Sequence, residues 1–115
     1  MNSKKITVFT AVLFVLLVAA CSPAAAGVGT DIPVNLPAVQ EAQKFLSQSL
    51  GVDVAQVQVV KVEDMEWPDA CLGLPNGDEA CAQVITPGFR ITLEVNGQTY
   101  ILHTDENGLN IRQEQ

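Results

Sequence analysis

The chain has 115 residues, and its 13 acidic and six basic side chains give a formal net charge of −7 at pH 7. This length is enough for one small domain and too short for two domains of ordinary size. Because an acidic surface repels phosphate groups, the composition argues against nucleic-acid binding and against a basic patch that holds anionic lipid headgroups.

The first twenty residues have the layout of an export signal. Two lysines, Lys4 and Lys5, precede an apolar run from Ile6 to Ala20. The run is too short to cross a bilayer as a helix, which needs about 20 apolar residues, and it ends in small residues. We therefore predict a signal peptide over residues 1–20.

The end of this segment is more specific. The letters LVAAC at residues 17–21 resemble the lipobox of bacterial lipoproteins. That resemblance implies that lipid is attached to the thiol of Cys21 and that the chain is cut just before it. An ordinary cleaved signal, or an uncleaved anchor with a chance cysteine, is the alternative. Cleavage would remove Lys4 and Lys5 and leave four basic and 13 acidic side chains, a net charge of 4 − 13 = −9. Because such a chain is not attracted to anionic headgroups, its attachment to a membrane would come from the lipid.

Residues 22–36 read as a flexible tether, because they are rich in small residues, glycine and proline and show no sustained period. A chain of this length reaches about 20 Å, which would hold a domain away from the bilayer. Ser22 follows the cysteine, and in bacteria with two membranes the lipoprotein resemblance then favours the outer membrane. In bacteria with a single membrane, the protein would sit on the cell membrane with its domain facing outside the cytoplasm.

The domain itself is predicted to occupy residues 37–115 and to begin with a helix. Pro37 suits a first helical position, and Gly51 suits the residue after the last turn. One stripe of this helix is apolar, with Phe45 beside it; the members of the stripe are Val39, Ala42, Leu46 and Leu50.

Four or five strands are predicted to follow. Residues 55–67 are β-branched and alternate, but Val59 and Val60 are adjacent apolar residues, which indicates a bulge or a buried centre. Residues 89–95 and 98–103 flank Asn96-Gly97, a strong hairpin signal for which paired residue numbers sum to 193. A turn at 104–108, with Asp105 at its start and Gly108 in a left-handed position, leads to a short strand at 109–112. The prediction is an α+β domain in which one helix packs on a four- to five-stranded antiparallel sheet.

Two further cysteines, Cys71 and Cys81, are predicted to form a disulfide. An exported protein meets an oxidising environment, whereas a zinc site needs four ligands, commonly at paired short spacings. A reactive thiol needs a basic neighbour, and this segment carries acids instead; both remain the less favoured alternatives. Closing this loop is worth roughly 3 kcal/mol, comparable with what a core of this size supplies, so the simplest interpretation is that the fold needs the bond.

The stretch from Glu66 to Gly108 resembles a group of small exported bacterial domains of unknown function. The shared features are a WPDxCLG box, a second cysteine near CAQ, a TPG turn and a Y…TD…G ending. The resemblance implies an extracytoplasmic domain in which Cys71 and Cys81 are paired, and it brings no activity with it.

No catalytic constellation is recognisable in the sequence. The WPD triplet at 67–69 occurs in the mobile loop of tyrosine phosphatases, but no arginine lies six residues after either Cys71 or Cys81. His103, the only histidine, is expected opposite Arg90 at the surface or at an edge. The motifs of serine hydrolases and zinc proteases are missing. We therefore predict no enzymatic activity and no cofactor.

Two classes of function remain. The favoured one is a membrane-anchored module that binds an unknown extracytoplasmic protein or small ligand through an exposed, braced loop, one version being a protease inhibitor. Trp67 is expected to be a core or rim aromatic against the disulfide. The candidate binding surface is Trp67, Asp69, Leu72, Leu74 and Pro75.

The alternative function is a carrier of a small ligand or of calcium. A ligand would lie on the sheet face that bears Arg90, Thr92, Thr99 and His103. Calcium would lie among the acids near the cysteines, namely Glu63, Asp64, Glu66, Asp69, Asp78 and Glu79.

Overall fold

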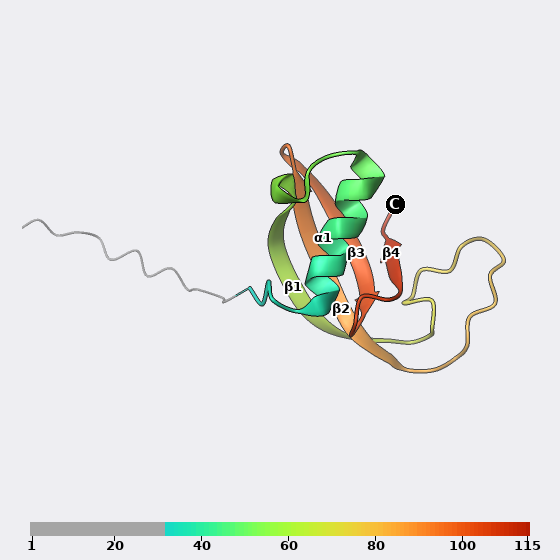
Figure 1. The fold of residues 1–115 in the computed structure, drawn as a ribbon. Coiled ribbons are helices and arrows are strands. Elements are labelled where there is room, and N and C mark those ends of the chain that lie inside the picture. The colour runs from blue at the N-terminus through green and yellow to red at the C-terminus, as the bar shows by residue number, and fades with distance from the viewer. Residues whose placement is uncertain (1–31) are drawn as a thin grey trace, which may run out of the picture.

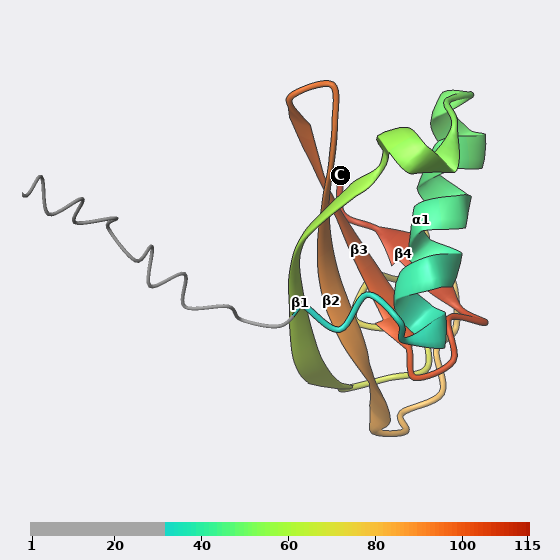
Figure 2. The same ribbon diagram turned by 60° about the vertical axis from the view of Figure 1, so that its left-hand side comes forward.

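The computed structural model describes residues 32–115, which form one helix packed on a four-stranded sheet (Figures 1 and 2). The elements are α1 (Pro37–Leu50), a short 3₁₀ turn η1 (Val54–Gln56), β1 (Gln58–Trp67), β2 (Thr86–Val95), β3 (Gln98–Asp105) and β4 (Ile111–Gln113). Each strand pairs antiparallel with the next one in the chain, in the order β1-β2-β3-β4. The predicted α+β fold is confirmed. The predicted signal peptide, Cys21 and most of the predicted tether lie outside the described residues.

Helix α1 begins and ends where the sequence predicts. Pro37 stands in its first turn, and Gly51 ends it in a left-handed conformation, with φ of 67°. Three residues of the predicted stripe, Val39, Ala42 and Leu46, are fully buried, whereas Leu50 is 38% exposed. The stripe therefore ends one turn earlier than expected. Leu36, assigned to the tether, packs against the core.

The sheet has the predicted register at its centre. Leu93 pairs with Tyr100 and Ile91 with Leu102, so the residue numbers of β2 and β3 sum to 193. The bulge predicted in the first strand lies between Val59 and Lys61. That strand starts later than expected, because the Asp53 side chain accepts a hydrogen bond from the Ala55 backbone N–H and closes the η1 turn instead.

The two faces of the sheet have different roles. The inner face packs against α1 and forms the core; its buried members are Ile91, Leu93, Val95 and Leu102, and Val57, just before β1, packs with them. The outer face bears Glu63, Arg90 and His103. The long connection between β1 and β2, residues 68–85, extends beyond β4 (Figure 1), and its residue Leu72 contacts His103 on the outer face. We call residues 68–85 the braced loop. Within residues 32–115, no helix has both the length and the apolar character needed to cross a membrane.

Candidate functional site

A row of polar side chains crosses the outer face of the sheet, one from each strand. The register places Glu63 of β1 opposite Arg90 of β2, Arg90 opposite His103 of β3, and His103 opposite Arg112 of β4. Side chains of directly paired residues lie close enough to interact. The sheet therefore assembles an ionic row from residues that are far apart in the chain.

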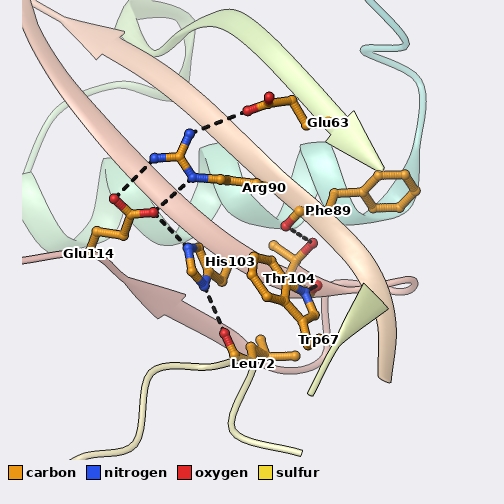
Figure 3. A network of polar contacts seen from close by, with 8 residues as sticks. All are labelled: Glu63, Trp67, Leu72, Phe89, Arg90, His103, Thr104 and Glu114. Carbon is orange, nitrogen blue, oxygen red and sulfur yellow. Dashed lines mark hydrogen bonds and ion pairs between the residues drawn. The ribbon is translucent and has the colours of Figure 1, made fainter. Parts of the chain in front are cut away.

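Glu114, just after β4, joins the middle of this row (Figure 3). Its carboxylate accepts two hydrogen bonds from the Arg90 guanidinium, at 2.9 and 3.1 Å, and lies 2.7 Å from Nε2 of His103. The guanidinium of Arg90, and after it His103, lower the pKa of Glu114 below its ordinary value. Glu114 is therefore an ionised acceptor shared by two basic side chains. Glu63 holds the other side of the same guanidinium, at 3.3 Å.

His103 is buried, and the expectation that it lies at the surface or at an edge is wrong. Only 7% of the residue is exposed, because the Trp67 ring stacks on the imidazole with centroids 3.9 Å apart. Trp67 is itself buried, and its indole N–H donates to the Thr104 carbonyl at 2.9 Å. The expected pairing of His103 with Arg90 is confirmed. What the sequence did not predict is the loop that closes over the ring.

The braced loop contacts His103 through Leu72. Nδ1 of His103 lies 2.8 Å from the Leu72 carbonyl oxygen (Figure 3), and the Leu72 side chain is fully buried. Leu72 has a left-handed backbone conformation, with φ of 57°, which costs a residue with a Cβ about 1–2 kcal/mol. Burial of the side chain and the contact with His103 offset that cost and hold the loop against the sheet.

The base of the loop is closed by covalent and hydrogen bonds. Cys71 and Cys81 form the predicted disulfide, with Cα atoms 5.6 Å apart. The Asp69 carboxylate accepts from the backbone N–H groups of Cys71 and Gly73, at 2.9 and 3.0 Å. The Ala70 N–H donates to the Ala82 carbonyl at 2.9 Å. This part of the chain therefore has a defined shape although it has no helix or strand.

Arg112 ties the far side of the loop to β4. Its guanidinium pairs with both carboxylate oxygens of Glu79, one at 2.8 Å, and donates to the Leu74 carbonyl at 3.2 Å. The hydrogen bond from Arg112, and after it the backbone N–H of Asn76, lower the pKa of Glu79 from 4.5 to about 2. Both halves of the disulfide-closed segment are thus fixed to neighbouring strands.

An open groove of about 820 Å³ lies between the braced loop, β4 and the second half of α1. The loop contributes residues 73–77, including Leu74 and Pro75; β4 and the residues beside it contribute Asn110, Ile111, Arg112, Gln113 and Gln115; and α1 contributes Phe45. Apart from Arg112, which is paired with Glu79, the lining side chains carry no charge.

The structure divides the predicted binding surface into two groups. Trp67 and Leu72 are buried, so the expectation that Leu72 is an exposed contact residue is wrong. Asp69 is occupied by its two backbone hydrogen bonds. Leu74 and Pro75 line the groove and remain accessible to a partner. The accessible part of the predicted surface therefore consists of Leu74 and Pro75, which follow the WPDxCLG segment.

The predicted ligand face and calcium cluster are not assembled as open sites. On the sheet face, Arg90 and His103 are already bound by Glu114. Among the acids, Glu63 is paired with Lys61 and Arg90, and Glu79 with Arg112. In the part of the chain that the structure describes, the one close group of metal-ligand side chains is Asp69, Cys71 and Cys81, whose sulfur atoms are joined to each other.

Sequence reasoning missed the residues that fix the loop, namely Arg112, Glu114 and Asn110. The Asn110 side chain donates to the Ala70 carbonyl at 2.8 Å. The signal was present in the predicted last strand: since β3 and β4 pair with residue numbers that sum to 215, Arg112 stands opposite His103. The position of the braced loop over these strands, in contrast, could not be predicted from any local pattern in the sequence.

Comparison with known proteins identifies one family. Residues 39–112 match a family described as a domain of unknown function (DUF8738). No curated protein matches the chain, and no solved structure matches it.

Proposed function

Since this chain belongs to the DUF8738 family, a domain of unknown function, we propose its role from the geometry of its own site. The protein is a lipid-anchored domain outside the cytoplasm that binds an extended segment of a partner protein and catalyses no reaction. The observation that carries this proposal is the groove beside the braced loop, in which a rigid loop faces the free edge of a strand.

Strand β4 is the last strand of the sheet, and its outer edge faces the groove. The backbone N–H of Asp105 donates to the Asn110 carbonyl, and the backbone N–H of Glu114 donates to the Ile101 carbonyl. In an antiparallel ladder, bonded positions alternate along each strand. The main-chain groups of Asn110, Arg112 and Glu114 therefore point toward β3, and those of Ile111 and Gln113 point outward. Such an edge is a template for an added strand.

The groove provides the second half of a peptide site. Leu74, Pro75, Ile111 and Phe45 offer apolar contacts, which suit the alternate side chains of an extended segment. The polar lining consists of amide side chains, and the one charged group, Arg112, is neutralised by Glu79. In an otherwise acidic protein, this neutral lining favours a partner segment without net charge.

Preorganisation favours this site over other surfaces. The disulfide, the Arg112–Glu79 pair and the His103 contact fix the loop before any partner arrives, which lowers the ordering cost of binding. In Figure 1 the described chain enters beside β1, and the braced loop projects beyond β4 at the opposite side. A tether attached at that entrance leaves the groove accessible from outside the membrane surface.

A pair of substitutions at Gln113 tests strand addition. Gln113→Pro removes an outward N–H and leaves the β3–β4 ladder bonds in place, because proline is tolerated on edge strands. Gln113→Ala removes only the side chain and serves as the matched control. We expect a photocrosslinker at Asn76, introduced into the full-length protein in its own cells, to capture a partner that is lost with Gln113→Pro and kept with Gln113→Ala.

A crosslinker at Gln98, which is exposed at the distant β2–β3 hairpin, provides the background. Capture at Gln98 equal to capture at Asn76, or capture that persists with Gln113→Pro, would show that the groove is not the binding site. If the partner is a secreted protease, the purified full-length protein in detergent should slow it at micromolar concentration, and the Gln113→Pro variant should not.

The lipid anchor has its own test. The intact mass of the protein extracted from its membrane should correspond to a chain that starts at Cys21 and carries acyl chains. Alkylation should find no free thiol before reduction and two after it, since Cys71 and Cys81 are paired. A mass without lipid would remove the membrane anchor from the proposal and leave the groove unaffected.

A further inference from the structure

His103 lies between two acceptors, and neither of them donates a hydrogen. Nδ1 is 2.8 Å from the Leu72 carbonyl oxygen, and Nε2 is 2.7 Å from the Glu114 carboxylate. A carbonyl oxygen only accepts, and an ionised carboxylate only accepts. Glu114 is ionised, because it also accepts two hydrogen bonds from the Arg90 guanidinium. Each ring nitrogen must therefore carry a hydrogen, which makes the ring an imidazolium.

We propose that protonated His103 is a pH-dependent anchor of the braced loop, and that loss of its proton releases Leu72 and loosens the segment from Cys71 to Cys81. The movement of the loop does not depend on the proposed function. Its effect on binding does rest on the proposed function, because a loosened loop would no longer form one side of the groove.

The reason for release lies in the neutral ring, which has a single N–H. A hydrogen bond to a charged acceptor is stronger than one to a neutral acceptor, so the remaining N–H stays on Nε2 and faces Glu114. Nδ1 then presents a lone pair to the Leu72 carbonyl at the present distance of 2.8 Å, which is repulsive. Because Leu72 is fully buried and has a left-handed backbone, its carbonyl reaches another donor only if the loop moves.

The charged groups around the ring come from every neighbouring element. Arg90 of β2 and Arg112 of β4 are its cross-strand partners and oppose protonation. Glu114 favours it directly, whereas Glu63 of β1 and Glu79 of the loop hold the two arginines. Trp67 covers the ring face. One carboxylate therefore contacts the ring, and each of the two nearby guanidinium groups is itself paired with a carboxylate.

The test uses the full-length protein in detergent, without a partner. Amide hydrogen exchange of residues 72–80 is measured as protection factors from about pH 5 to about pH 9. We expect loop protection to fall roughly tenfold or more as the ring loses its proton, the size of effect that one hydrogen bond from a charged donor gives. Protection at Leu93, in the buried hairpin, should stay constant over the same range and reports that the fold is intact.

Two variants separate anchoring from packing. Glu114→Gln replaces the carboxylate by an amide that can donate to Nε2, so a neutral ring keeps its Nδ1–H on Leu72; we expect high loop protection at every pH. His103→Phe keeps a ring against Trp67 and removes both N–H groups; we expect low loop protection at every pH. If His103 only filled space, His103→Phe would keep the loop protected, because the phenyl ring still packs against Trp67.

Nitrogen chemical shifts of the single histidine show directly how many ring hydrogens are present. The inference is overturned if the ring carries one hydrogen at about pH 5, if wild-type loop protection does not change with pH, or if Glu114→Gln loses protection as the wild type does. Because no partner is present, a failed crosslink at Asn76 with an intact pH response would overturn the proposed function alone.

Discussion

Replacement of Leu72 by alanine measures how firmly the braced loop is packed. The Leu72 side chain is fully buried although it lies outside helices and strands. Truncation of a buried leucine loses transfer free energy and leaves a cavity, which together cost about 2–5 kcal/mol. Alanine also has a Cβ, so the left-handed backbone at this position gains no relief. We therefore expect Leu72→Ala to lower the free energy of unfolding by about 3 kcal/mol.

The assay is urea unfolding followed by two signals. Trp67 is the only tryptophan, and its ring stacks on His103 beneath the loop, so its fluorescence reports on this region. Far-ultraviolet circular dichroism reports on α1 and the sheet. With a slope of about 1 kcal/mol per molar urea for a small domain, the midpoint should fall by roughly 3 M in both signals.

Leu74→Ala is the matched control, because Leu74 is only half-buried and lines the groove. Its cost should be about 1 kcal/mol or less. If Leu72→Ala were no more destabilising than Leu74→Ala, Leu72 would not be packed in solution. The original expectation of an exposed Leu72 contact surface would then replace the buried one.

Three further outcomes are expected. Gly88→Ala should lower the melting temperature, because a Cβ at Gly88 would overlap the Thr104 carbonyl oxygen, and overpacking costs about 1–3 kcal/mol; an unchanged calorimetric transition would contradict this contact. Replacing Cys71 and Cys81 by serine should cost about 3 kcal/mol and match the effect of reductant on the wild type; a smaller effect of reductant would mean that the bond is not formed. Glu79 has a pKa lowered from 4.5 to about 2, so its contribution to stability is present above pH 4.5 and lost as the pH falls toward 2. The difference in melting temperature between wild type and Glu79→Gln should therefore be constant near neutral pH and disappear near pH 2; a difference that persists there would show that Glu79 does not act through its charge.

Local signals predicted most of the fold. Pro37 and Gly51 marked the ends of the helix, and Asn96-Gly97 fixed the register of the central hairpin, because these residues act through their own backbone geometry. The adjacent valines at 59 and 60 revealed the bulge by their phase. The start of β1 was predicted too early, since the Asp53 side chain competes with strand pairing through a hydrogen bond that hydropathy does not reflect.

The site was less predictable, because its contacts join distant parts of the chain. The disulfide could be predicted from cysteine number and spacing, whereas the burial of Leu72 and His103 depends on where an 18-residue connection, from 68 to 85, lies on the sheet. No hydrophobic period or turn motif in that connection predicts where it packs on the sheet. Arg112 and Glu114 were missed for the same reason, since each contributes through a partner more than ten positions away.

The order of these contacts along the chain has a consequence for biogenesis. The disulfide joins residues only ten positions apart, so it can close before the strands that hold the loop are in place. The groups that fix the loop come later, and Arg112 lies 31 positions after Cys81 (112 − 81 = 31). Until β3 and β4 are in place, His103 and Arg112 cannot hold the loop, and Cys71 is not yet buried. Closure of the disulfide can therefore precede docking of the loop, and an oxidant reaches the Cys71 thiol more readily before docking than after it, when Cys71 is buried.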